Sequence, residues 1–223
     1  MTGRAEIIGD ALLILGDSRE LLSTVGAIDA VVTDPPYGIG YVHSGGGRGK
    51  HSRRNAGVGV HGDLEPFDPR PLLKAAPQAI IWGADHFYPR LPDAGRWLAW
   101  DKLAGVDLQD SFADVEFAWQ NREAPARVFS HLWKGILQDS EKDGRRLHPT
   151  QKPVALMSWC IGHLTGSPAV IADPFMGAGS TGIAALRAGR RFVGFEIDPG
   201  HFAVACDRIA DVYRQPGLFG GAT

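Results

Sequence analysis

Short apolar runs alternate with turns and amphipathic segments along most of this chain. The run at 30–33 is apolar and β-branched, and it stops at Pro35 and Pro36. A short apolar run bounded by proline and glycine is typical of a buried strand. Similar runs predict two short strands within 6–16, joined by a turn at Gly9-Asp10, and further strands at 78–83, 96–102, 169–173 and 191–198. Residues 115–119 alternate between apolar and other positions, as an outer antiparallel strand would.

Helices are predicted between these strands by caps and by apolar spacing. Ser18 can cap a short helix through Leu22, Pro71 suits the first turn of a helix over 68–74, and another short helix starts within 85–88. Pro153 opens a helix over 154–164, and a helix from the glycine turn through 186 stops at Gly189. A final amphipathic helix covers 201–213, with its inward positions at Phe202, Ala205, Ile209 and Val212.

This order of elements predicts the fold class. We expect a single α/β domain over residues 1–223, built on a mostly parallel seven-stranded sheet with an antiparallel strand at one side and helices on both faces. Residues 121–147 are polar and are expected to be irregular. The tryptophans at 82, 97, 100 and 119 are expected to pack in this fold and not to stack on bases.

Composition narrows the class of protein. The chain has 223 residues, 44% hydrophobic and 22% charged, which is typical of one globular domain with a proper core. A net charge of −2 argues against indiscriminate nucleic-acid binding, so any DNA contact must come from local basic patches. Cys160 and Cys206 lack metal-site spacing, so we expect no metal and a reducing cytoplasm. No apolar stretch approaches a membrane span, so no membrane contact is expected.

The turn Asp34-Pro35-Pro36-Tyr37 carries the most specific chemistry. It follows a predicted strand, and ligands of open α/β sheets bind at the carboxyl ends of the strands. The Asp34 carboxylate and the Pro35 carbonyl could each accept one N–H bond from an exocyclic amine and aim its lone pair at an electrophile. The Tyr37 ring could stack on the base that carries the amine. The alternative interpretation is a rigid surface turn.

A second site is predicted where the strand at 169–173 meets a helix. Gly177 and Gly179 let the backbone approach a ligand, and the helix amino end favours its carboxylate. Glu196 ends the next strand about twenty residues on, a spacing that suits an acceptor for ribose hydroxyls. A nicotinamide dinucleotide would satisfy this geometry equally well. The turn at Asp34 decides for S-adenosylmethionine, because that turn has no role in hydride transfer.

The two motifs together resemble a known family. Asp34-Pro-Pro-Tyr37, followed far downstream by Asp173-Pro-Phe-Met-Gly-Ala-Gly179, is similar to the DNA amino-methyltransferases, which methylate adenine or cytosine on the exocyclic nitrogen. The order resembles the permuted subgroup in which the catalytic motif comes first. The resemblance covers about residues 7–42, 79–120 and 148–213, and it implies a Rossmann-like fold that binds S-adenosylmethionine.

The resemblance also assigns the site residues. Asp34, Pro35, Pro36 and Tyr37 would be catalytic. Asp17 would lie in the cofactor pocket, although it could equally be a helix-capping residue. Lys152 lies in a segment that resembles the one holding the methionine end of the cofactor, or it marks a capped helix start. The cofactor site would comprise Asp17, Asp34, Lys152, Asp173, Pro174, Phe175, Gly177, Gly179, Thr181 and Glu196.

Two basic segments are candidates for DNA contact. Residues 43–62 are glycine-rich and basic, so they read either as a solvated linker or as a mobile flap over double-stranded DNA. The family usually has a target-recognition region at 121–147, but here that region is much shorter than in most members. The candidate DNA-binding residues are Arg48, Lys50, Arg53, Arg54, Arg145 and Arg146.

The resemblance implies S-adenosylmethionine-dependent methylation of adenine in DNA, with the base flipped out of the duplex. Cytosine amino-methylation is the alternative within the family, but that branch more often carries serine where Asp34 stands. RNA or protein amide substrates use related turns. A non-catalytic cofactor and nucleic-acid binding module would be signalled by a broken catalytic turn, and this turn is intact. The sequence leaves the oligomeric state open, including a homodimer.

Overall fold

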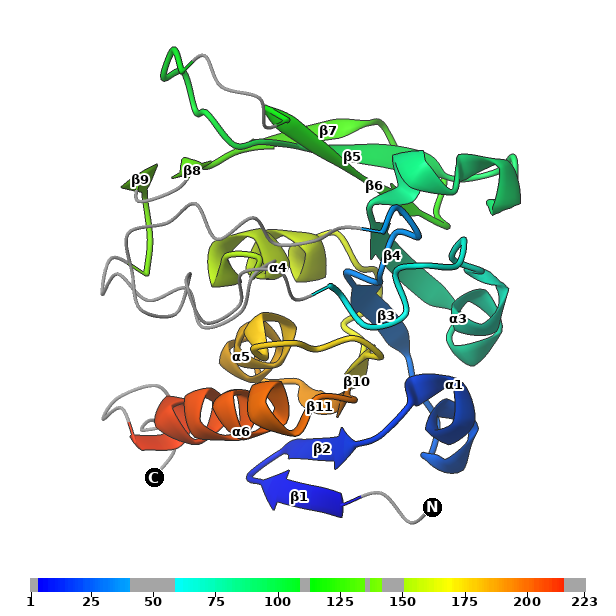
Figure 1. Ribbon diagram of the computed structural model, residues 1–223, viewed down its shortest axis with the longest axis vertical. Helices are drawn as coiled ribbons and strands as arrows, with labels where there is room; N and C mark the ends of the chain where they lie inside the picture. The colour runs from blue at the N-terminus through cyan, green and yellow to red at the C-terminus, as the bar shows by residue number, and fades with distance from the viewer. Residues whose placement is uncertain (1–3, 41–58, 109–112, 135–136, 142–150, 215–223) are drawn as a thin grey trace.

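A mixed sheet forms the centre of the computed structural model, which describes residues 4–40, 59–108, 113–134, 137–141 and 151–214 (Figure 1). Its strand order is β1-β2-β11-β10-β3-β4-β6-β5-β7. The strands are β1 (Arg4–Ile8), β2 (Ala11–Leu15), β3 (Ala30–Thr33), β4 (Gln78–Trp82), β5 (Arg96–Asp101), β6 (Val115–Gln120), β7 (Arg127–Ser130), β10 (Val170–Asp173) and β11 (Arg191–Glu196). A separate two-stranded ribbon joins β8 (Trp133–Lys134) to β9 (Leu137–Gln138).

The sheet is mostly parallel, as predicted. The central strands β2, β11, β10, β3 and β4 run in the same direction, while β1 and β6 run against their neighbours. The predicted number of seven strands is wrong, because nine strands of the described residues join this sheet. The prediction for residues 121–147 misses β7, which pairs with β5 and closes one edge. Edge strands are often polar and short, so their sequences resemble loops. Because β5 and β7 lie beyond it, β6 is not the outer strand.

Helices cover both faces of the sheet, which confirms the predicted layers. On one face lie α4 (Val154–Gly162), α5 (Ser180–Arg187) and α6 (Pro199–Arg214), and on the other lie α1 (Ser18–Leu21), α3 (Arg70–Ala75) and the 3₁₀ turns η1 (Leu22–Thr24), η2 (Ala84–His86) and η3 (Tyr88–Arg90) (Figure 1). Neighbouring positions of one strand serve the two cores: Val32 packs in the core under α4–α6, and Val31 in the core under α3. Strands that are buried on both faces have continuous apolar sequences, and for this reason the apolar run at 30–33 predicts β3.

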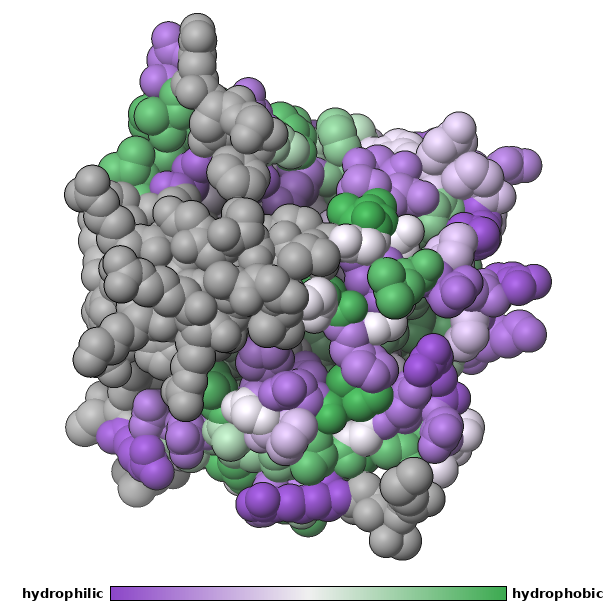
Figure 2. Space-filling view, viewed as in Figure 1, coloured by the Kyte–Doolittle hydropathy of each residue, from purple (hydrophilic) through white to green (hydrophobic). Residues whose placement is uncertain are grey.

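Packing explains most of the remaining predicted positions. Phe202, Ala205, Ile209 and Val212 are all buried on α6, as the apolar spacing predicts. Trp82, Trp100 and Trp119 are also buried, whereas Trp97 of β5 is 38% exposed. Figure 2 shows polar and apolar residues intermingled over the described part of one face. Among the described residues, no helix is both long and apolar enough to cross a lipid bilayer.

Candidate active site

The carboxyl ends of three adjacent parallel strands bring the two predicted motifs together. Asp34 follows β3, Asp173 ends β10 and Glu196 ends β11, and these strands are neighbours in the order β3-β10-β11. The Thr33 hydroxyl donates a hydrogen bond of 2.6 Å to Asp173 Oδ1, across the boundary between the two motifs. Ligands of open α/β sheets bind at such an edge, so the catalytic turn and the glycine turn belong to one site.

The Asp34–Tyr37 turn is stabilised by a hydrogen bond within the turn and by a ring contact with η2. The Tyr37 hydroxyl donates to Asp34 Oδ1 over 2.6 Å. The Tyr37 ring stacks on His86, with ring centroids 4.9 Å apart and an angle of 18° between the planes. The ring also passes over Gly83, where an added Cβ would lie only 1.9 Å from Tyr37 Cε1. The Asp34 side chain is only 16% exposed, so its carboxylate faces this cluster more than it faces solvent.

Lys152 approaches the same turn from the segment before α4. Its ammonium lies 2.6 Å from Asp34 Oδ2, 3.1 Å from the Tyr37 hydroxyl and 3.0 Å from Glu116 Oε2. The segment is fixed on both sides of the lysine. The carboxylate of Glu141 accepts bonds from the Val154 amide and from the Gln151 side chain, at 2.8 and 2.9 Å. Lys152 is therefore a buried cation that joins Asp34 to Glu116.

The charges in this cluster shift one another. Burial raises the pKa of Asp34, and the Lys152 ammonium opposes that rise. Burial and the neighbouring Asp34 raise the pKa of the Tyr37 hydroxyl well above its usual value, so the hydroxyl remains a donor. Burial would lower the pKa of Lys152, but Asp34 and Glu116 outweigh it and raise that pKa well above the ordinary lysine value. The cluster therefore holds a stable ammonium beside an acceptor carboxylate.

The glycine turn after β10 has the backbone that its sequence predicts. Gly177 has φ +50° and Gly179 has φ +77°, a region that favours glycine. Asp173 organises this turn: besides Thr33, it accepts bonds from the Thr181 hydroxyl at 2.6 Å and from the Phe175 amide at 3.0 Å. Burial raises the pKa of Asp173 to about 6, against the lowering effect of the two threonine hydroxyls. In this structure Asp173 and Thr181 hold the turn in shape.

Glu196 lies beside the glycine turn, as predicted. Its carboxylate accepts hydrogen bonds from the Gly177 amide at 3.0 Å and from the Asp198 amide at 2.8 Å. Burial raises the pKa of Glu196, and these backbone amides partly offset the rise. Asp17 follows β2, the neighbour of β11, but its carboxylate caps α1 and pairs with the Arg19 guanidinium at 2.5 Å. The helix cap is therefore Asp17 and not Ser18.

The structure brings Asp34, Tyr37, Lys152, Asp173 and Glu196 to one edge of the sheet. The catalytic and cofactor-binding roles of these residues remain predictions. The same holds for the residues that follow Asp34 and Asp173 in the sequence: Pro35, Pro36, Pro174 and Phe175. The candidate DNA-binding residues lie outside the described residues: Arg48, Lys50, Arg53, Arg54, Arg145 and Arg146.

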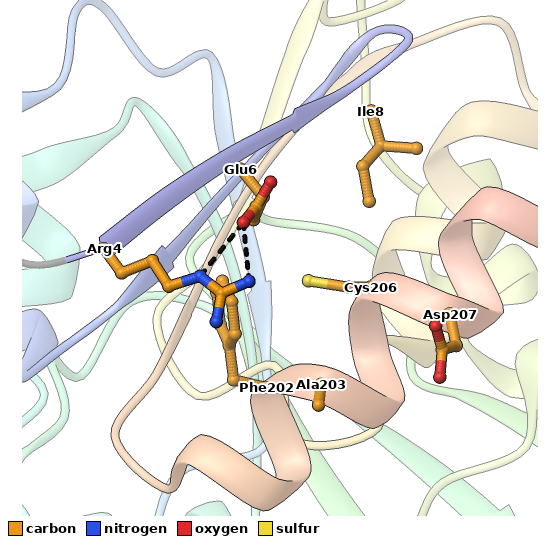
Figure 3. Close-up of a pocket in the computed structure, with 7 residues that line it drawn as sticks. All are labelled: Arg4, Glu6, Ile8, Phe202, Ala203, Cys206 and Asp207. Carbon is orange, nitrogen blue, oxygen red and sulfur yellow. Dashed lines mark hydrogen bonds and ion pairs between the residues drawn. The ribbon is translucent and has the colours of Figure 1, made fainter.

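A hollow on another part of the molecule is not this site. It has a volume of about 260 Å³ and lies between β1 and α6 (Figure 3). Arg4 and Glu6 pair within it at 2.8 Å, and Phe202 and Cys206 face it from the helix (Figure 3). Because β1 is four strands away from β3, at roughly 4.8 Å per strand, the hollow is remote from the catalytic turn.

Sequence reasoning missed two charged residues at the site. Glu116 of β6 contacts Lys152, and Lys102, directly after β5, binds Glu116 Oε1 at 2.9 Å. A local signal existed, because an acid in an otherwise apolar strand segment needs a buried partner or a solvent-facing side. The identity of that partner depends on strand register and on the approach of α4, which no local pattern encodes.

Comparisons with known proteins agree with this geometry. A family described as DNA methylase matches residues 93–207. YubD of Escherichia coli (strain K12), named as a methylase, is 30% identical over 212 residues, which are 90% of this chain and 91% of that protein.

Two solved structures share the fold. One is a complex of M1.HpyAVI with SAM, with a TM-score of 0.54 and 21% identity over 89% of this chain and 98% of that one. The other is the PvuII DNA methyltransferase, described as cytosine-N4-specific, with a TM-score of 0.56 and 17% identity over 93% and 92% of the two chains. From the family match and the relative that spans nearly its whole length, the chain belongs to the family of DNA methylases that act at N6 or N4 amino groups.

Proposed function

We propose that this DNA methylase transfers the methyl group of S-adenosylmethionine to the exocyclic N6 of adenine in double-stranded DNA. One observation carries the proposal: an intact Asp34-Pro-Pro-Tyr37 turn lies on β3, next to the strand that leads into the Gly177–Gly179 turn. A non-catalytic binding module would have no need for a buried, cation-supported carboxylate at this position, since burying an ion pair is costly.

Asp34 and Pro35 act on the target amine. The Asp34 carboxylate and the Pro35 carbonyl accept its two N–H bonds and so draw the nitrogen toward tetrahedral geometry. Each carboxylate oxygen has two lone-pair sites. Asp34 can therefore keep its bonds to Tyr37 and Lys152 while it accepts a bond from the amine. The Tyr37 ring provides the stacking surface for a base turned out of the duplex.

The residues at the neighbouring strand ends fit the cofactor. Gly177 and Gly179 have positive φ angles and carry no side chains, so a ligand can approach the backbone of this turn closely. Glu196 offers the ribose hydroxyls a half-buried carboxylate, and Asp17 and Phe175 follow β2 and β10, the strands on either side of β11. S-adenosylmethionine, when bound, would supply the methyl group to the amine nitrogen, with S-adenosylhomocysteine as the leaving product and the proton of the methylated amine passing to solvent.

Adenine is favoured over cytosine by Asp34, because the cytosine branch of the family more often carries serine there. Cytosine N4 is the second candidate, because the PvuII enzyme, whose fold is similar, is described as cytosine-N4-specific. The same two acceptors would serve either amine, so the distinction rests on the base pocket.

Base analysis after methylation tests the proposal. Unmethylated DNA of mixed sequence, made by amplification, is incubated with the protein and methyl-labelled S-adenosylmethionine, then digested to nucleosides. The expected product is labelled N6-methyladenosine in its deoxy form. Label in N4-methylcytosine would select the second candidate, and unlabelled DNA with a tightly bound cofactor would refute both.

A further inference from the structure

Two carboxylates share one ammonium at the catalytic turn. Lys152 Nζ lies 2.6 Å from Asp34 Oδ2 and 3.0 Å from Glu116 Oε2, and Lys102 Nζ lies 2.9 Å from the other oxygen of Glu116. The charges thus alternate along one chain of contacts, from Asp34 through Lys152 and Glu116 to Lys102. The lysine side chains are 8% and 13% exposed, so both cations are largely withdrawn from solvent.

Strand register brings Glu116 to this position. Glu116 pairs with Trp100, and Ala118 with Leu98, on the face of β5 and β6 that packs toward α4. Lys102 continues the same side of β5, two residues beyond Trp100, and its amide donates to the Asp114 carbonyl. The neighbours of Glu116 in sequence, Val115 and Phe117, point to the opposite face and are 37% and 39% exposed. The Glu116 side chain therefore points into the molecule, while the apolar side chains of Val115 and Phe117 are partly exposed.

The cluster favours ionised Glu116. Burial would raise the pKa of its carboxyl, but the Lys152 and Lys102 ammonium groups outweigh burial and lower that pKa to about 2. An ionised Glu116 gives the Lys152 ammonium a second anionic contact besides Asp34. Without it, the flexible lysine chain would have one anionic partner and more rotamers to choose from.

We infer that Glu116 is a positioning residue of the methyltransferase site, which holds the Lys152 ammonium against Asp34 and thereby fixes the carboxylate that accepts the target amine. This inference rests on the proposed function. Tyr37 binds Asp34 Oδ1 and Lys152 binds Oδ2, so the plane of the carboxylate is set by two donors. Displacing one donor lets the carboxylate rotate, and a misplacement of about 1 Å at a reacting group costs roughly 100-fold in rate.

In this role the Lys152 ammonium binds Asp34 and not the methionine end of the cofactor. The two assignments differ in what Glu116→Gln changes. If Lys152 serves Asp34, the variant lowers kcat by about 10- to 100-fold, while the Kd for S-adenosylmethionine is unchanged. If Lys152 serves the cofactor, the variant raises that Kd instead.

The pH profile separates positioning from general structural damage. Asp34 is faced by Lys152, by Tyr37 of its own turn, by Glu116 of β6 and by Asp173 of β10. Removing the like charge of Glu116 favours ionised Asp34, so the acidic limb of the kcat profile moves to lower pH in Glu116→Gln. Removing the cation has the opposite effect, so the limb moves to higher pH in Lys152→Met. A merely loosened fold would not shift the two variants in opposite directions.

The experiment measures kcat, the KM for unmethylated mixed-sequence DNA and the calorimetric Kd for S-adenosylmethionine in five proteins. They are the wild type, Glu116→Gln, Lys152→Met, the double variant, and Asp114→Asn as matched control. Asp114 lies two residues away and pairs with Lys134 at 2.7 Å, so the control loses a nearby carboxylate outside the Asp34–Lys152–Glu116 chain. Thermal unfolding of each protein confirms that it is folded at the assay temperature.

If Glu116 acts through Lys152, Glu116→Gln lowers kcat in the wild-type background. In the Lys152→Met background the same substitution causes no further loss of kcat. The control keeps its kcat. Wild-type kcat in Glu116→Gln, multiplied losses in the double variant, or a raised cofactor Kd would each overturn the positioning role. A wild-type protein that binds the cofactor but leaves DNA unmethylated would refute the proposed function, and the positioning role with it.

Discussion

Gly83→Ala should displace the Tyr37 ring without replacing any residue of the proposed reaction. Gly83 has φ +69°, and a Cβ there would lie 1.9, 2.3 and 2.4 Å from three atoms of the Tyr37 ring. Carbon atoms in contact are roughly 3.5–4.0 Å apart, so the ring must move by more than 1 Å, as an order of magnitude. Such a movement breaks the 2.6 Å bond from the Tyr37 hydroxyl to Asp34.

The structure sets the size of the effect. A non-glycine residue in the left-handed region costs about 1–2 kcal/mol. A hydrogen bond to a charged group contributes roughly 1.5–3 kcal/mol. The free energy of unfolding should therefore fall by about 2.5–5 kcal/mol. The kcat for methyl transfer should fall by roughly 100-fold, because the stacking ring and the Asp34 carboxylate both lose their positions.

Gly189→Ala is the matched control. Gly189 has φ +68°, nearly the same backbone, but nothing lies within 4 Å of an added Cβ. The control should lose only the backbone contribution of about 1–2 kcal/mol and should keep its kcat. Denaturant unfolding and a labelled-methyl assay on the two variants separate the clash from the strain. Equal kcat in Gly83→Ala and Gly189→Ala would show that the position of Tyr37 does not matter to the reaction.

Three further predictions address the cofactor site, the glycine turn and the basic segment 43–62. Glu196→Ala should weaken S-adenosylmethionine binding by about 1.5–3 kcal/mol for each charge-assisted bond lost, measured by calorimetry; unchanged affinity would make this acid structural. Burial raises the pKa of Asp173 from 3.8 to about 6, so the protonated form is favoured in the folded chain. The contribution of Asp173 to the free energy of unfolding is fully present below pH 3.8. It is lost as the pH rises through 6, and the loss amounts to about 3 kcal/mol. Unfolding free energies of Asp173→Asn should lack this loss, and an identical pH slope in the variant would contradict it. Alanine at four basic positions of segment 43–62 should raise the DNA KM and flatten its salt dependence while sparing cofactor affinity, and a retained salt slope would place DNA contact elsewhere; the four are Arg48, Lys50, Arg53 and Arg54.

The edge of the sheet that carries the site was predictable because its signals are local. The run before Asp34 and the run before Gly177 each combine buried apolar residues with a turn that stops the strand, and both appear where expected. Parallel strands joined by helices place such turns at one edge, so the approach of Asp34 and Glu196 follows from topology.

The charge cluster behind Asp34 was not predictable, because it depends on long-range register. Alternation over 115–119 predicts a strand but not which face meets α4, and the structure turns Glu116 toward that helix. The place of β6 inside the sheet likewise depends on its pairing with both β4 and β5, and no local pattern encodes that pairing. Asp17 shows the converse case, where a local cap and an adjacent Arg19 account for the residue's contacts in this structure.

The proposed role of Asp34 is to act on the target amine and not chiefly on the cofactor. Asp34→Ala tests it directly, with methyl transfer to unmethylated DNA and calorimetric S-adenosylmethionine binding measured on the same preparation. Lys152 keeps Glu116 as an anionic partner in this variant, so the ammonium is not left unpaired. We expect that labelled methyl transfer is abolished while the cofactor Kd changes little. Near-normal turnover in the variant, or loss of cofactor binding as complete as the loss of transfer, would contradict it.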